Sequence, residues 1–163
     1  MTATADLFKR GLVLFWAGWL TLVLGSNLFD AFHELGWVGD GFHFVSGNFG
    51  LIEETTAIYE FPGWLNGLLF AGVIAWEALG AALLWWAFLR YRDGGTGERV
   101  LIAFAVPLGL WAAFVLADEL FIAYQAGLEA THLRVFIAQL VTLLVIFLLP
   151  GPAARVPGGH GER

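Results

Sequence analysis

The sequence predicts an all-α fold, a bundle of four membrane-spanning helices. Of the 163 residues, 59% are hydrophobic and only 13% are charged, with a mean hydropathy of +0.75, which is far more apolar than an ordinary soluble domain. Four apolar segments account for most of the length, and each approaches the roughly 20 residues that cross a bilayer. The lipid bilayer is therefore the first expected partner. The net charge of −6 argues against nucleic acid as another.

The first predicted span covers residues 11–34. Lys9 and Arg10 precede its apolar run, a pattern shared with signal peptides. The run continues with helical spacing as far as Glu34 and has no small-residue cleavage site, which favours a retained helix. Residues 35–61 then form the one long connection, rich in glycine and aromatic residues and then in acidic ones.

The rest of the chain reads as three further helices and a tail. The predicted spans are residues 63–89, 100–124 and 129–149, and residues 151–163 are expected to be disordered, so that residues 1–150 form a single domain. Pro62 suits the entry to the second span because proline is tolerated in the first turn of a helix. Pro107 lies inside the third span and predicts a kink there.

The positions of the basic residues predict the orientation in the membrane. They are Lys9, Arg10, Arg90, Arg92, Arg99, Arg134, Arg155 and Arg163. All except Arg134 fall on one side of the predicted bundle, and residues 30–63 contain none. By the positive-inside rule both termini and the turn at 90–99 face the cytoplasm, and the long loop faces out. We therefore expect a multi-pass protein of the cell inner membrane.

Counting 1.5 Å per residue along each span shows where polar side chains lie in depth. The inner half of every span is apolar, and the polar residues are at mid-depth or nearer the outer face. Because polar groups within a membrane must turn towards one another or towards water, they predict a polar pocket that opens outward and ends blindly. Its predicted lining is Asn27, Asp30, Asn66, Glu77, Asp118, Glu119, Glu129, Arg134 and Gln139. An apolar inner half disfavours a channel through the monomer.

Glu77 is the deepest charged residue of this set. A carboxyl group at the centre of a span costs roughly 2.5 to 3.5 kcal/mol on insertion scales, so its presence calls for a role. One hypothesis is a neutral carboxyl that donates a hydrogen bond to Gln139, to Thr142 or to a backbone carbonyl and joins two helices. The other is a proton acceptor or ligand contact at the floor of the pocket.

Two acid and histidine pairs raise the alternative of a metal site. Asp30 and His33, and Glu129 and His132, are three residues apart and share a helix face, as do the Glu-x-x-His pairs of di-iron bundles. The candidate ligands for a divalent metal cofactor are Asp30, His33, Glu119, Glu129 and His132. Glu77 lies roughly 15 Å deeper than Glu119 and is too far away to join them. The competing interpretation is an ion-pair network in which Asp30, Asp118 or Glu119 is the partner of Arg134.

Several motifs resemble an uncharacterised bacterial family of predicted small integral membrane proteins, a four-span domain of unknown function. They are Asn27-Leu-Phe-Asp30, Ala75-Trp-Glu77-Ala-Leu, Glu119-Leu-Phe-Ile-Ala-Tyr-Gln125, Glu129 with Arg134, and Leu143-Leu-Val-Ile-Phe147. The chain departs from the family pattern at Ala117-Asp118, where the family has two glycines, and at His132. The resemblance implies four spans and no particular activity.

The leading functional hypothesis is a non-enzymatic accessory or ligand-binding membrane protein, because the sequence has no nucleophile motif, no cofactor fingerprint and no polar path across the membrane. The alternative is a membrane metalloenzyme at the outer end of the bundle. A subunit of a proton-coupled transporter is the third hypothesis. Other membrane proteins or a second copy of the chain are further expected partners.

Overall fold

The computed structural model describes residues 2–91, 96–123 and 128–149. This part of the chain is helical and holds no strand, which confirms the predicted all-α class. The elements are α1 (Thr2–Glu34), α2 (Asn48–Thr56), the short 3-10 helix η1 (Ala57–Tyr59), α3 (Gly63–Leu89), α4 (Thr96–Leu120) and α5 (Leu128–Leu148). Four of them, α1, α3, α4 and α5, are long and apolar enough to cross a membrane. The tail predicted at 151–163 lies outside the described residues.

Three of the four predicted spans differ from the observed helices. Helix α1 begins at Thr2 rather than at residue 11, α5 lies one residue earlier than predicted, and α4 is displaced further. Whereas α3 covers the same residues as the second predicted span, α4 begins and ends four residues before the predicted 100–124. At its start Glu98 is in the first turn, where a negative charge is favoured by the helix dipole. At its end the helix stops before Ile122, whose φ of 53° lies in the left-handed region, and that conformation cannot continue a right-handed helix.

A glycine ends α1. Gly36 has a φ of 71°, a conformation that glycine adopts without steric penalty. The Gly36 amide donates to the carbonyl of His33 at 2.9 Å, and the Trp37 amide donates to the carbonyl of Phe32 at 2.8 Å. This pair of hydrogen bonds is the Schellman motif, which satisfies the last carbonyls of a helix.

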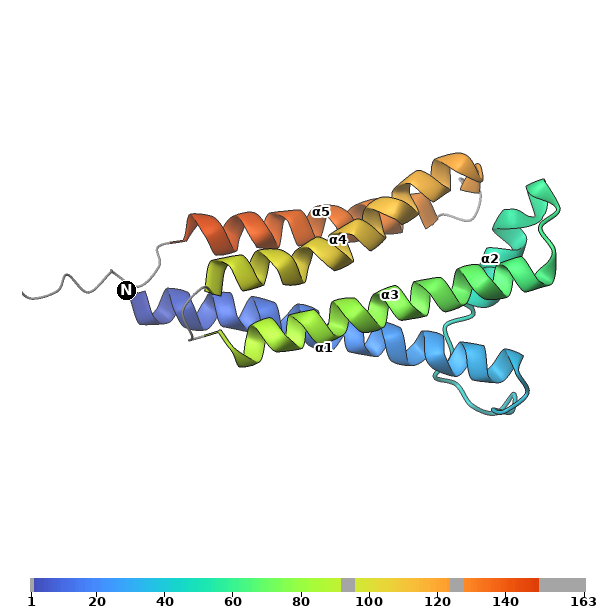
Figure 1. Cartoon of the computed structure of the whole chain (residues 1–163), viewed down its shortest axis with the longest axis horizontal. Coiled ribbons are helices and arrows are strands. Elements are labelled where there is room, and N and C mark those ends of the chain that lie inside the picture. The colour runs from blue at the N-terminus through green and yellow to red at the C-terminus, as the bar shows by residue number, and fades with distance from the viewer. Residues whose placement is uncertain (1, 92–95, 124–127, 150–163) are drawn as a thin grey trace, which may run out of the picture.

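The connection between the first two spans contains a helix that the sequence analysis did not predict. Helix α2 packs against α1 and α3, and Figure 1 shows it beside α3 at the end of the bundle away from the N-terminus. It follows Gly47, whose φ of 72° is again left-handed. The long loop expected at 35–61 is therefore in part a wall of the bundle.

The apolar core lies at one end of the molecule. We call the packed end the end where α1 and α4 begin and where α3 and α5 finish. Buried residues meet there from α1, α3, α4 and α5, among them Leu20, Leu84, Phe104 and Ile146. The helices approach closely at Gly80, where a Cβ atom would lie 2.9 Å from Leu20 Cδ2. This core occupies the half of each span that the sequence left without polar residues.

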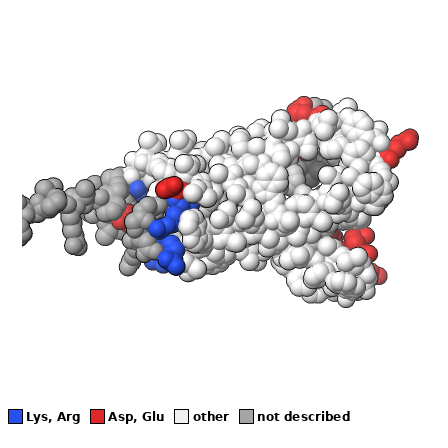
Figure 2. Space-filling view, in the orientation of Figure 1, with Lys and Arg blue, Asp and Glu red and all other residues white. Residues whose placement is uncertain are grey.

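At the opposite end, which we call the splayed end, α4 and α5 diverge from α1 and α3 (Figure 1). The charges divide between the two ends. Figure 2 shows Lys and Arg gathered at the packed end and most of the acidic residues of this face at the splayed end. The polar residues of the predicted pocket are in the splayed half.

Candidate functional site

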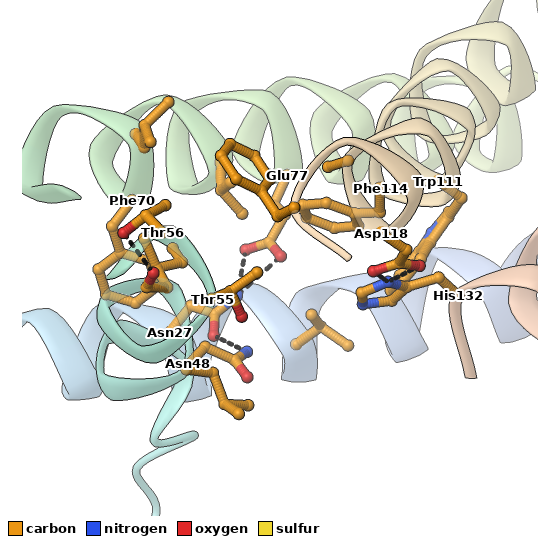
Figure 3. Close-up of a pocket in the computed structure, with 17 residues that line it drawn as sticks. Asn27, Asn48, Thr55, Thr56, Phe70, Glu77, Trp111, Phe114, Asp118 and His132 are labelled. Carbon is orange, nitrogen blue, oxygen red and sulfur yellow. Dashed lines mark hydrogen bonds and ion pairs between the residues drawn. The ribbon is translucent and has the colours of Figure 1, made fainter. Parts of the chain in front are cut away.

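A cavity of about 230 Å³ lies in the splayed half. All five α-helices contribute to its lining, and Figure 2 shows the surface hollowed in this region. Most of the wall is apolar, with aromatic side chains such as Phe70, Trp111 and Phe114, and two polar groups interrupt it. One group is centred on Glu77 and the other pairs Asp118 with His132 (Figure 3).

Glu77 is 1% exposed and accepts hydrogen bonds from α1. The Asn27 side-chain amide donates to Glu77 Oε1 at 2.7 Å and to Oε2 at 2.9 Å. In turn the Asn48 amide of α2 donates to Asn27 Oδ1 at 2.8 Å. The prediction that Gln139 or Thr142 is the partner of Glu77 is wrong, because this face of α3 is turned towards α1 and both of those residues are on α5.

The second polar group joins α4 to α5. His132 Nδ1 lies 2.8 Å from Asp118 Oδ2 and 3.0 Å from Oδ1. The imidazole stacks on Phe114 at a centroid distance of 4.9 Å. Asp118 is 3% exposed, and its hydrogen-bond partner is the His132 imidazole. The sequence analysis had offered Asp118 as a partner of Arg134 instead.

Two predicted pocket residues lie beside the cavity and hold α2 in place. Asp30 Oδ2 accepts a hydrogen bond from the hydroxyl of Ser46 at 2.9 Å and another from the backbone amide of Phe49 at 3.0 Å. Asn66 Oδ1 accepts one from the hydroxyl of Thr56 at 2.8 Å. Both residues are buried. Asp30 thus serves the first turn of α2, where a carboxylate also suits the helix dipole.

Asp30→Ala is expected to loosen α2. Losing a charge-assisted hydrogen bond at a helix N-terminus removes about 1 to 2 kcal/mol, so the amides of residues 49–56 should exchange hydrogen roughly 5 to 30 times faster. Hydrogen exchange with mass spectrometry in nanodiscs measures this change. The control is Glu54→Ala, which removes an exposed carboxyl from α2 itself. Unchanged protection in Asp30→Ala would show that Asp30 does not anchor the helix.

The remaining predicted residues are not brought together. Glu119, Glu129 and Arg134 are exposed, and Arg134 makes no ion pair within the described part of the chain. Gln139 is fully buried outside the cavity lining, and neither atom of its amide has a hydrogen-bond partner among the described residues. His33 lies 3.2 Å from Asp40 at the surface.

The metal candidates are therefore scattered. In the ranges that the structure describes, no three His, Asp or Glu side chains converge closely enough to hold a metal ion. Asp30 is turned towards α2 and His132 towards Asp118, so residues that share a stripe on one helix face different neighbours. The geometry gives the metal hypothesis no support within these residues.

Sequence reasoning missed the wall that α2 supplies to the cavity. Asn48, Leu51, Ile52, Thr55 and Thr56 all line it. Their positions, at i, i+3, i+4, i+7 and i+8, follow the spacing of an amphipathic helix, and Gly47 precedes the first of them. Those are the two signals in the sequence that point to this helix.

Comparison of the chain with models of protein families, with curated proteins and with solved structures gave no match. The resemblance to a four-span family consequently remains an expectation. The four long apolar helices are consistent with a membrane protein.

Proposed function

We propose that this chain is a non-enzymatic membrane protein that binds a small molecule in the cavity of its splayed half. The observation that carries the proposal is the cavity itself. Its wall is mainly apolar and aromatic, and a few polar groups face it, namely the buried Glu77 and Asp118 and the partly buried His132. Concave apolar sites with a small number of placed polar groups are the usual form of a ligand site.

The volume limits the ligand. An engineered apolar cavity of about 150 Å³ holds benzene, so about 230 Å³ admits a ring of that size with a short polar arm. Sites for drug-sized molecules run from about 300 to 1,000 Å³. The proposed ligand is therefore a small amphipathic molecule.

The polar groups support binding more than catalysis. A nucleophilic enzyme holds its nucleophile within hydrogen-bond reach of a base. Within the described residues the hydrogen bonds of the His132 ring go to Asp118 alone. The hydroxyl of Thr56 is committed to Asn66 and to the backbone of α2.

We further propose that the protein lies in the cytoplasmic membrane with the packed end inside the cell. Lys9, Arg10, Arg90 and Arg99 are all at this end, which supports the orientation through the positive-inside rule. The cavity then opens towards the outer face.

Ligand-observed ¹⁹F NMR with the protein in nanodiscs tests the binding function. The probes are 4-fluorobenzyl alcohol, 4-fluorobenzylamine and 4-fluorobenzoate, which share one shape and differ in charge. We expect saturable binding of at least one probe, and we expect Ala117→Phe to abolish it by filling the cavity that Ala117 lines. The matched control is Ala105→Phe on the exposed side of the same helix, which should bind as the wild type does.

Empty nanodiscs correct for partition of the probes into lipid. Absence of saturable binding for all three probes would overturn the proposal. Binding that is equal in the wild type and in a folded Ala117→Phe variant would place the probe elsewhere and would also overturn it.

A further inference from the structure

The cavity is lined by acidic side chains and by no Lys or Arg. The two carboxyl groups of the lining are those of Glu77 and Asp118. His132 is the one lining residue that can become positive, and it is already hydrogen bonded to Asp118. Along α1, Lys9 is about 27 Å from Asn27. The cations of the packed end are thus remote from the cavity.

The hydrogen bonds around Glu77 are arranged for a charged carboxylate. Asn27 donates to both oxygens of Glu77. Asn48 donates to the Asn27 amide oxygen, which orients the Asn27 amide so that its N–H group faces the carboxyl. A carboxylate has about four acceptor sites, and the amide group of Asn27 uses two of them. A buried charge is stable only when it is paired as well as hydrogen bonded. Within the described residues no cationic side chain reaches Glu77.

The surface around the cavity favours the approach of cations. At the splayed end seven carboxyl side chains are exposed: Glu34, Asp40, Glu53, Glu54, Glu60, Glu119 and Glu129. The one basic residue of Lys or Arg type described at this end is Arg134. Carboxylates that surround a cleft with low-dielectric walls raise the local concentration of cations and speed their association.

The walls indicate an organic cation. A metal ion needs several converging oxygen or nitrogen ligands, which the described residues do not gather. Trp111 and Phe114 present aromatic rings to the cavity, and aromatic faces attract ammonium groups. The apolar remainder of the wall suits a hydrocarbon body.

We infer that the ligand is a monovalent organic amine in its protonated form, with an apolar body of about the size of one ring and an ammonium group that donates a hydrogen bond to Glu77. This inference rests on the proposed binding function and assigns the charge of the ligand. Glu77 is then the counter-ion of the ligand, and the cavity discriminates among molecules of equal shape by their charge.

The same three probes test the inference at neutral pH and low salt. We expect 4-fluorobenzylamine, which is protonated under these conditions, to bind at least tenfold more tightly than 4-fluorobenzyl alcohol, and 4-fluorobenzoate to bind most weakly. Glu77→Gln keeps the size and the acceptor oxygen of the side chain and removes its charge. This variant should bind the alcohol and lose the preference for the amine. Glu129→Gln is the matched control, because it removes an exposed carboxyl outside the cavity.

The outcomes separate the two proposals. If the alcohol and the amine bind the wild type equally and Ala117→Phe removes both, the binding function stands and the inference about charge is overturned. If no probe binds, the binding function fails. A preference for the amine that persists in folded Glu77→Gln would overturn the assignment of Glu77. Should Glu77→Gln not fold, the ratio of the two affinities in the wild type decides the inference alone.

Discussion

Asn27→Leu is expected to lower the free energy of unfolding by about 3 kcal/mol. The substitution removes the amide that donates to both oxygens of Glu77 and leaves a carboxyl that is 1% exposed without its hydrogen-bond donor. The double variant Asn27→Leu with Glu77→Leu replaces both polar partners by apolar groups, which is far less costly than leaving one unpaired. It should regain most of the lost stability.

Equilibrium unfolding in mixed detergent micelles, followed by circular dichroism, measures these changes. Gln139→Leu is the matched control, because it also replaces a buried amide by leucine. Neither amide atom of Gln139 has a partner within the described residues, so this change should be neutral or stabilising by about 1 kcal/mol. The single variant Glu77→Leu completes the comparison. If the losses of unfolding free energy in Asn27→Leu and Glu77→Leu simply add in the double variant, the two side chains are not coupled.

Labelling at the two ends of the bundle is expected to be all or none. The chain contains no cysteine, so a single introduced thiol reports one position. In right-side-out membrane vesicles a membrane-impermeant maleimide should label Glu54→Cys fully, because α2 belongs to the proposed outer end. The same reagent should label Glu98→Cys only after permeabilisation. Both glutamates are exposed, so the comparison is matched in residue type and in access.

The reverse labelling pattern would show that the packed end faces out. The proposed orientation would then be wrong, and the cavity would open to the cytoplasm. Equal labelling of both positions in sealed vesicles would indicate mixed insertion, which the strong asymmetry of Lys and Arg argues against.

The sequence was informative about height in the membrane and uninformative about rotation. Hydrophobic length located α3 at its observed bounds, and counting residues placed Glu77 in the half of the bundle that is polar. Depth, however, does not say which way a helix turns about its axis. Glu129 and Arg134 were assigned to the pocket by their height and are exposed in the structure.

The partners of the buried polar groups were unpredictable for the same reason. Counting residues put Gln139 and Thr142 at the depth of Glu77 and Asn27 nearer the outer face, whereas the packing of α1 against α3 makes Asn27 the partner of Glu77. Helix α2 was missed because nine residues with a weakly apolar face give little signal beside four long spans. Its position depends on contacts with Asp30 and Asn66, which are distant in sequence.

The packed end joins two pairs of helices, α1 with α3 and α4 with α5, which separate towards the splayed end. At the packed end the first and last helices are tied together: Lys9 Nζ donates to the carbonyl of Leu149 at 2.7 Å, and Trp16 Nε1 donates to the hydroxyl of Thr142 at 3.0 Å. At the other end Glu77 and Asp118 belong to opposite pairs. Because α5 is about 30 Å long, a rotation of roughly 5° about the packed end would move its tip by about 2.6 Å, so a small rotation there would change the separation of Glu77 and Asp118.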